Sequence, residues 1–274
     1  MNQRCILMLV NPARKEAQGA SEIILKHLAE ADIRIITTAD SVVSDIEIVL
    51  VLGGDGTILR GAEYAIDKNV PLLGINLGHV GFMAEVEAFT YELVAKAIIE
   101  KSFVLDERML LGYEVTRENV VVNSGWALNE ISIERKSTTM LELFVQIDDR
   151  PLSRWGCDGI ICATPTGSTA YAFSAGGPVL WPEVQALVLL PIAAHALFAK
   201  PMVIAPTSTI GVAIESTDAS LSADALRKFN LEKDDQVSIT KNSVSVTLAH
   251  LKSTIFTDRL VAKFKLPVEG WRGE

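Results

Sequence analysis

A carboxylate set among glycines, where a strand gives way to a helix, constrains this chain more than any other feature. The segment consists of Gly53, Gly54, Asp55, Gly56 and Thr57. It follows the apolar run 48–52, which is typical of a buried parallel strand, and precedes residues 58–66, whose apolar side chains have helical spacing. Glycines let the backbone approach an anion closely, and the amino end of a helix attracts one. The segment therefore predicts a phosphate-binding loop in an α/β domain.

A structural explanation of the same segment stays open. Asp-Gly is a common hairpin turn, but no alternating strand follows Thr57. A helix cap formed by Asp55 or Thr57 is the stronger alternative, because both residue types accept hydrogen bonds from a first helical turn. On this segment alone the phosphate loop and the capped turn are equally supported. A carboxylate repels a phosphate, so Asp55 in a phosphate-binding loop requires a further function, such as accepting a proton or holding a metal.

Net charge and hydropathy exclude two classes of partner. The net charge of −9 and the isoelectric point near 5.1 argue against a general electrostatic grip on nucleic acid. The longest apolar stretch, residues 184–206, is interrupted by prolines, a histidine and a lysine. It predicts a buried segment rather than a membrane span. We therefore expect neither a nucleic-acid nor a membrane partner.

The cysteines indicate a reducing compartment. Cys5, Cys157 and Cys162 form no CxxC pair and are odd in number. Because the last two lie along an expected strand, we interpret all three as core thiols rather than as a disulfide or a metal site. Residues 1–10 are interpreted as a first strand rather than a signal peptide. These features predict a cytoplasmic protein.

The pattern of elements predicts two domains. Apolar runs favour strands at 4–10, 33–37, 48–52 and 71–75, alternating with helices at 19–31, 58–67 and about 89–101. Such alternation is typical of an α/β domain with a parallel sheet, expected over residues 1–103. Short β-rich segments separated by turns then follow at 110–116, 120–123, 127–134, 140–147, 159–163, 209–214, 236–240 and 244–248. They predict a mostly antiparallel, β-sandwich-like domain over residues 104–253.

The arrangement of the two domains follows from this division. We expect the site to lie in the cleft between them. In the tail, residues 254–274, Phe256, Leu260 and Phe264 are spaced four apart. This spacing predicts a helix that packs back onto the first domain.

A second polar segment lies at residues 158–171, where an expected strand leads into a turn rich in hydroxyl side chains. Pro165 fixes the turn, and Ser168 or Thr169 is expected to cap a following helix. Hydroxyls suit a neutral ligand such as a ribose, and Tyr171 offers a face on which a ring can stack. For this segment alone, a structural turn is the simpler explanation.

A third candidate is the pair Asn129 and Glu130 on an otherwise apolar strand. Polar groups in a strand core need partners. A buried hydrogen-bond network and a ligand contact both explain this pair.

Taken together, these segments closely resemble the NAD kinases from about residue 48 to the carboxyl terminus. The resemblance rests on residues 53–57, 74–82, 128–130, 158–159, 164–171 and 174–178. The closing residues 266–273 look like the actinobacterial branch. Diacylglycerol and sphingosine kinases and related phosphofructokinases share the first motif alone, whereas the combination is specific.

The resemblance implies transfer of a phosphoryl group from ATP or polyphosphate to the 2′-hydroxyl of the adenosine ribose of NAD, giving NADP. Asp55 would orient and deprotonate that hydroxyl, close to Mg²⁺ but without a dedicated protein cage for the metal. The donor phosphates would meet Arg60 and the loop residues Gly53, Gly54, Gly56 and Thr57.

The family pattern also assigns residues to the dinucleotide. Asn129 and Glu130 would bind the ribose and adenosine, and Asp158 would lie near the nicotinamide side. The remaining dinucleotide contacts would come from Thr166, Thr169, Ala170, Tyr171, Ala172, Phe173 and Ser174. The resemblance further implies a homodimer or homotetramer.

Two places depart from the family pattern. Where members usually carry Asp-Gly-Gln, this chain has Asp224, Ala225 and Leu226, so Asp224 is interpreted as no more than a turn residue. Thr139 stands where a basic residue is common. The sequence does not choose between ATP and polyphosphate, between NAD and NADH, or between oligomer sizes, and feedback by NADP is unreadable.

Two other functions compete with this interpretation. A lipid or other small-molecule kinase would share the motif at 53–57, but would have no reason to keep the pair at 129–130. A regulatory protein that binds NAD or NADP without catalysis would have no reason to keep Asp55.

Overall fold

The computed structural model describes residues 3–13, 15–37, 45–76, 81–83, 91–252 and 255–268. The chain divides into two compact units, residues 1–108 with 246–274, and residues 109–245. Strands β5 (Val104–Arg117) and β16 (Gln236–His250) contribute residues to both units.

The first unit is built on a parallel sheet. Its strands lie in the order β2-β1-β3-β4-β16, and each neighbouring pair is parallel. Besides β16, the sheet contains β1 (Cys5–Val10), β2 (Arg34–Ile36), β3 (Val49–Leu52) and β4 (Leu72–Ile75). The helices are α1 (Lys15–Glu30), α2 (Asp55–Lys68), α3 (Tyr91–Glu100) and α5 (Phe256–Phe264). The predicted parallel α/β architecture is confirmed.

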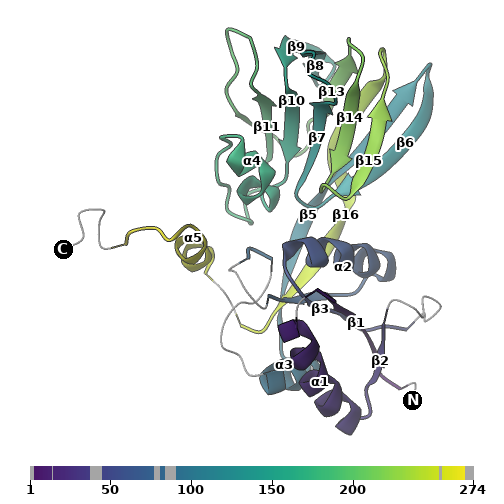
Figure 1. Ribbon diagram of the computed structural model, residues 1–274, viewed down its shortest axis with the longest axis vertical. Coiled ribbons are helices and arrows are strands. Elements are labelled where there is room, and N and C mark those ends of the chain that lie inside the picture. The colour runs from purple at the N-terminus through teal and green to yellow at the C-terminus, as the bar shows by residue number, and fades with distance from the viewer. Residues whose placement is uncertain are drawn as a thin grey trace. The chain divides into compact units, whose positions relative to one another are not determined.

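Helices cover both faces of this sheet (Figure 1). Ile24 and Leu28 of α1 share one core with Val94 and Ile98 of α3. Helix α2 packs on the opposite face, where a Cβ at Gly61 would lie 2.5 Å from Val51 Cγ2. Only glycine fits there, so α2 lies close against β3 and its amino end is held near the carboxyl end of that strand.

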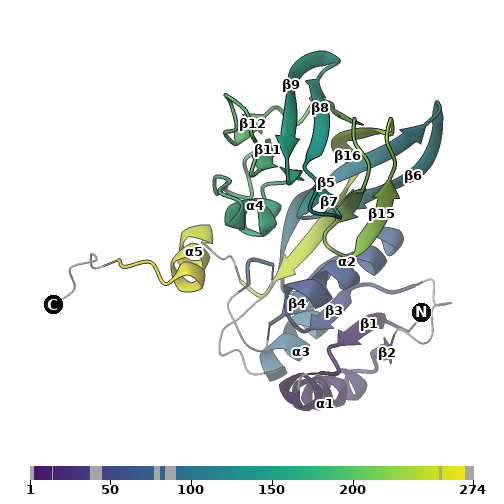
Figure 2. The same cartoon turned by 45° about the horizontal axis from the view of Figure 1, so that its top comes forward.

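The second unit is a sandwich of two antiparallel layers (Figure 2). One layer is a six-stranded sheet in the order β12-β11-β10-β7-β14-β15. Its strands are β7 (Glu130–Arg135), β10 (Gly159–Ala163), β11 (Leu187–Ile192), β12 (Met202–Ile204), β14 (Ala219–Ala223) and β15 (Arg227–Leu231). The other layer contains β8 (Leu141–Ile147), β9 (Arg150–Cys157), β13 (Ile210–Ile214) and the first part of β16.

The layers bury a common core. Val145 and Ile210 from one layer pack with Ile133 and Leu221 from the other. Strand β5 pairs with β6 (Val120–Ala127) as a hairpin, and the turn after β10 forms the short helices η1 (Gly167–Thr169) and α4 (Tyr171–Ser174). The predicted β-sandwich-like domain is confirmed, whereas the expected cleft between the domains stays a prediction.

Several boundaries differ from the predictions. Helix α1 begins at Lys15 rather than 19, and α2 begins at Asp55 rather than 58. The segments predicted at 236–240 and 244–248 are one continuous strand, β16, because the intervening polar residues 241–243 keep the strand conformation instead of forming a turn. Strands β9, β11, β12, β14 and β15 were not predicted. Residues 77–80 of the segment 74–82, residues 89–90 of the expected helix and residues 269–273 of the closing motif lie outside the described residues.

Other expectations are partly corrected. All three cysteines are buried free thiols, as predicted, but Cys157 ends β9 and Cys162 lies on β10 rather than on one strand. The stretch 184–206 is buried at residues 186–191, mostly within β11, whereas Leu197 and Phe198 are exposed. In the part of the chain that the structure describes, no helix has the length and apolar character needed to cross a membrane.

Candidate functional site

The glycine segment forms a tight connection between β3 and α2. The Gly53 amide donates to the Ile75 carbonyl of β4 at 2.9 Å, and a Cβ at Gly53 would lie 2.6 Å from Thr57 Oγ1. Gly54 is the N-cap in an extended conformation, with no side-chain hydrogen bond to the helix end. The alternative of a helix cap by Asp55 or Thr57 is therefore excluded, because both residues lie inside the first helical turn. That leaves the amino end of α2 suited to an anion.

Asp55 is placed in this first turn with an unusual environment. Its Oδ1 is fully buried and has no hydrogen-bond partner among the described residues. Gly81 packs directly on Oδ1, because a Cβ built there would overlap that atom and would lie 3.2 Å from Asn76 Nδ2. Burial raises the pKa of Asp55, opposed by Lys263, by Arg259 and by the amides of Met83 and Phe82. A half-buried carboxylate of raised pKa at the amino end of a helix is equipped to take a proton from a ligand.

Two asparagines beside the loop were not singled out as site residues from the sequence, although Asn76 lies within the motif at 74–82. Asn11, at the carboxyl end of β1, donates from Nδ2 to Thr57 Oγ1 at 3.4 Å. Asn76 follows β4 and lies beside Gly81. Because carboxyl ends of parallel strands meet at one edge, the topology brings both amides to the Asp55 edge of the sheet. Arg60 lies one turn into α2 and is exposed.

In the second unit, Asn129 immediately precedes strand β7 and Glu130 begins it, and both are held by Asp224. The Asp224 side chain is fully buried, and its carboxylate accepts from the amides of Leu128 at 2.9 Å and Asn129 at 2.7 Å. Its Oδ2 also receives Arg227 Nη2 at 2.9 Å. The interpretation of Asp224 as only a turn residue is therefore wrong. It is the acceptor that fixes the backbone of the Asn129–Glu130 pair.

The hydroxyl-rich turn packs against the same pair. The Thr164 amide donates to the Asn129 carbonyl at 2.9 Å, and a Cβ at Gly167 would overlap that carbonyl. The predicted cap by Ser168 or Thr169 is wrong. Ser168 Oγ instead bridges the turn, donating to the Pro165 carbonyl at 2.7 Å and accepting from the Leu180 amide at 2.9 Å. Its role is to hold the turn in place, with η1 leading into α4.

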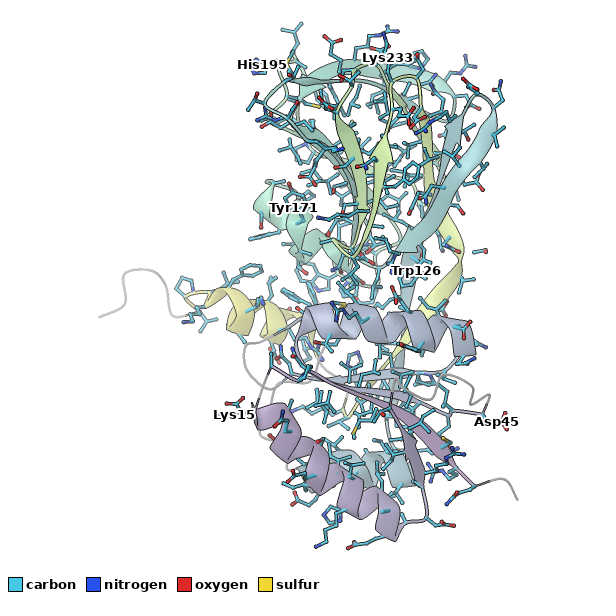
Figure 3. All side chains as sticks on the ribbon, turned by 45° about the vertical axis from the view of Figure 1, so that its right-hand side comes forward. Lys15, Asp45, Trp126, Tyr171, His195 and Lys233 are labelled. Carbon is cyan, nitrogen blue, oxygen red and sulfur yellow. The ribbon has the colours of Figure 1, made fainter. Side chains whose placement is uncertain are left out.

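Tyr171 lies on α4 (Figure 3), and its hydrogen bonds connect this helix to strand β7. Its amide donates to Glu130 Oε2 at 3.4 Å and its hydroxyl to Glu134 Oε2 at 3.0 Å. Burial, together with the hydrogen bond to Glu134, raises the pKa of Tyr171 to about 12, so the hydroxyl stays a donor at neutral pH.

Beside Tyr171 lies a polar hollow of about 550 Å³. Its walls include Glu130, Ser132, Glu134, Tyr171, Ser222 and Lys228. The hollow has the size and the hydrogen-bonding groups to take part of a nucleotide.

The other residues predicted to contact the dinucleotide differ in their exposure to solvent. Thr166 is buried, Thr169 and Ala170 are half-buried, and Phe173 and Ser174 are exposed. Ala172 is fully buried in a core cluster, so its side chain packs inward. Asp158 forms an ion pair with Arg135, with Nε 2.9 Å from Oδ1. The predicted residues thus form two groups, one on each unit.

Glu130 gives the second unit a pH-dependent stability. Burial, reinforced by the charges of Asp224 and Glu134, raises its pKa from 4.5 to about 7. A raised carboxyl pKa contributes stability below the unfolded value, and the contribution is lost as pH rises through the folded value. We expect the free energy of unfolding to fall by up to about 3 kcal/mol between pH 4.5 and 8 from this group. Urea unfolding of Glu130→Gln should lack this decline, whereas exposed Glu142→Gln should keep it; an unchanged decline in Glu130→Gln would contradict the assignment.

Ala225 occupies a backbone conformation that suits glycine. In the turn between β14 and β15 its φ is 57°, which costs an L-residue about 1–2 kcal/mol. We expect Ala225→Gly to raise the free energy of unfolding by about 0.5–1 kcal/mol, after the larger entropy of the unfolded glycine chain is subtracted. Ala262→Gly in helix α5 serves as the control and should lower stability. Destabilisation by Ala225→Gly in urea titrations would contradict the expected strain.

Comparison with known proteins matches both parts of the chain to the two domains of one protein family. Residues 37–103 match the ATP-NAD kinase N-terminal domain, and residues 128–251 match the ATP-NAD kinase C-terminal domain. NAD kinase 2 of Streptomyces avermitilis is 50% identical over 230 residues, covering 83% of this chain and 76% of that protein. NAD kinase of Mycobacterium bovis is 42% identical over 303 aligned positions, covering 99% of each chain.

Solved structures share the fold. An NAD kinase from Archaeoglobus fulgidus in complex with ATP superposes with a TM-score of 0.73 at 26% identity, over 96% of this chain and 98% of that one. Yeast NADH kinase complexed with NADH gives a TM-score of 0.85 at 23% identity, over 100% of this chain and 89% of that one. At that identity the second likeness concerns the fold alone.

Proposed function

The chain belongs to the NAD kinase family and phosphorylates NAD to NADP with ATP, and on that premise we propose that Asp55 is the general base. The observation that carries this proposal is the half-buried Asp55 carboxylate of raised pKa in the first turn of α2, beside the glycine loop. A ribose hydroxyl is a weak nucleophile, and a positioned base contributes about 10²–10⁴-fold to its reaction. Asp55 would accept the proton of the 2′-hydroxyl as that oxygen attacks the γ-phosphorus of ATP and ADP departs.

The donor side belongs to the first unit. The glycine loop and the amino end of α2 would receive the donor phosphates, with Thr57 and Arg60 adding a hydroxyl and a positive charge. In the described part of the chain, no group of three or more His, Cys, Asp or Glu side chains is placed to hold a metal. We propose that the donor phosphates hold most of the Mg²⁺ coordination, with Asp55 nearby. When bound, it neutralises charge that develops on the transferred group.

The acceptor side belongs to the second unit. Asn129 and Glu130 would hold the adenosine ribose, because both are fixed by Asp224 and face the turn that carries Tyr171. Other contacts along the dinucleotide would come from Asp158, Thr166, Thr169, Ala170, Phe173 and Ser174. We extend the proposal to Mg²⁺ as the cofactor, to polyphosphate as a second donor and to a homodimer or homotetramer in the cytoplasm.

An acceptor assay tests the proposed reaction. Purified protein with NAD, Mg²⁺ and ATP should form NADP, detected by an NADP-specific dehydrogenase, while diacylglycerol as acceptor should remain unphosphorylated. The same assay with polyphosphate in place of ATP tests the second donor. Absence of NADP with either donor would overturn the proposal, and phosphorylated lipid would favour the alternative lipid kinase.

A further inference from the structure

Helix α5 is attached to the segment that packs on Asp55. The ring of Phe82 lies 5.6 Å from that of Phe256 and 5.9 Å from that of Phe264. These two α5 residues are eight positions apart and share one face of the helix. Phe82 itself is buried. The helix thus holds Phe82 at two points along its length.

Arg259, on the same helix, adds a polar connection at this place. Its Nη1 donates to the Phe82 carbonyl at 2.9 Å, and its Nη2 lies 3.3 Å from His250 Nδ1. A guanidinium has no acceptor, so His250 must accept at Nδ1 and carry its proton on Nε2. That nitrogen is 3.4 Å from Asp106 Oδ2. The contacts form a chain from Asp106 through His250 and Arg259 to the Phe82 carbonyl.

The Asp106 end of this series of contacts is held in place by buried neighbours. His250 is only 4% exposed and Arg108 only 7% exposed. Although burial favours the neutral acid, hydrogen bonds from His250 and Arg108 hold the pKa of Asp106 at about 2. Asp106 therefore stays charged at working pH, and it fixes the imidazole that receives Arg259.

At its other end, this series of contacts reaches the Asp55 carboxylate through Phe82 and Gly81. Gly81, next to Phe82, packs against Asp55 Oδ1 so closely that no Cβ fits. A shift of Phe82 would therefore move the wall against which the Asp55 carboxylate is set. A displacement of about 1 Å at a reacting group can cost about 100-fold in rate.

We infer that Arg259 is a positioning residue for Asp55, acting through the Phe82 carbonyl and the packing of Gly81. This inference rests on the proposed role of Asp55 as base. Burial raises the pKa of Asp55, and the positive charges of Lys263 and Arg259 lower it. Helix α5 therefore acts on this carboxylate through its charges as well as through the contacts of Arg259.

Kinetics of the full chain test the inference. Arg259→Met keeps most of the side-chain stem and removes the donors, so kcat should fall at least about tenfold while KM for NAD stays within about twofold. Arg259→Lys should recover part of kcat, because one ammonium can reach the carbonyl but cannot also hold the imidazole in a planar fork. Lys265→Asn removes the same charge just beyond α5, at a φ of 51° that asparagine tolerates, and should keep wild-type kcat.

A second measurement separates positioning from general instability. Hydrogen exchange at the amides of Phe82 and Met83 should accelerate in Arg259→Met and stay unchanged in Lys265→Asn. Wild-type kcat in Arg259→Met, or equal losses in Lys265→Asn, would overturn the inference. If Arg259→Met does not fold, Arg259→Lys carries the test, with wild-type kcat as the contradicting result.

The two proposals fail in different ways. Loss of turnover in Asp55→Asn with wild-type turnover in Arg259→Met would remove only the positioning role. Wild-type turnover in Asp55→Asn would remove the base on which that role depends.

Discussion

Asp55→Asn is expected to bind NAD and lose turnover by at least about 100-fold, the smallest loss typical of a missing general base. The exchange preserves the shape of the side chain, and the residues proposed for NAD lie on the other unit. The amide cannot accept the proton of an attacking hydroxyl, so kcat should fall while the dissociation constant of NAD stays close to wild type. NADP formation and calorimetric titration of NAD measure the two quantities separately.

Asp67→Asn is a matched control for this variant. It removes the same charge from the exposed end of the same helix, where Asp67 meets Lys68 at the surface. Its turnover should equal that of the wild type, since exposed ion pairs contribute little. Near-wild-type turnover in Asp55→Asn would remove Asp55 from the chemistry, and parallel losses in both variants would point to the helix rather than to the base.

Asp224→Asn is expected to destabilise the second unit by about 3–5 kcal/mol, the usual effect of breaking a buried ion pair. Asparagine tolerates the φ of 53° at this position. Its NH₂ group would face donors, however, because the Leu128 amide and Arg227 both donate to Oδ2. NAD affinity should fall as well, since the backbone of Asn129 loses its anchor.

Urea unfolding followed by tryptophan fluorescence measures this effect, because Trp126, Trp155 and Trp181 all lie in the second unit. Asp234→Asn supplies the control, with the same charge change at another turn of positive φ, 70°, and an exposed side chain. Equal stability of Asp224→Asn and wild type would contradict the assigned role of Asp224.

The sequence predicted most of the fold where hydrophobic spacing was regular. Strands β1, β3 and β4 have continuous apolar runs, and their predicted positions agree within one residue. Strands β14 and β15 were missed because serine, lysine and asparagine alternate with their apolar residues, a composition that also suits turns. Strand β16 was split in two because the polar residues 241–243 inside this long strand look like a turn.

The candidate site was predictable where glycines and paired polar residues form motifs. The motifs at 53–57 and 129–130 carried that signal, while the functional value of Asp224 did not follow from its neighbours. A carboxylate that holds backbone amides nearly a hundred positions away leaves no local pattern. The same holds for Arg259 and His250, whose contacts depend on how α5 and β16 meet the segment at Phe82.

In the proposed reaction NAD is the acceptor and its 2′-hydroxyl the nucleophile. Phosphorus NMR of the product formed from NAD and ATP tests it most directly. We expect one new phosphomonoester signal per ADP released, coupled to the 2′ proton of the adenosine ribose. ADP release with the phosphate on another hydroxyl, or with no phosphorylated NAD, would rule out the 2′-hydroxyl of NAD as the nucleophile.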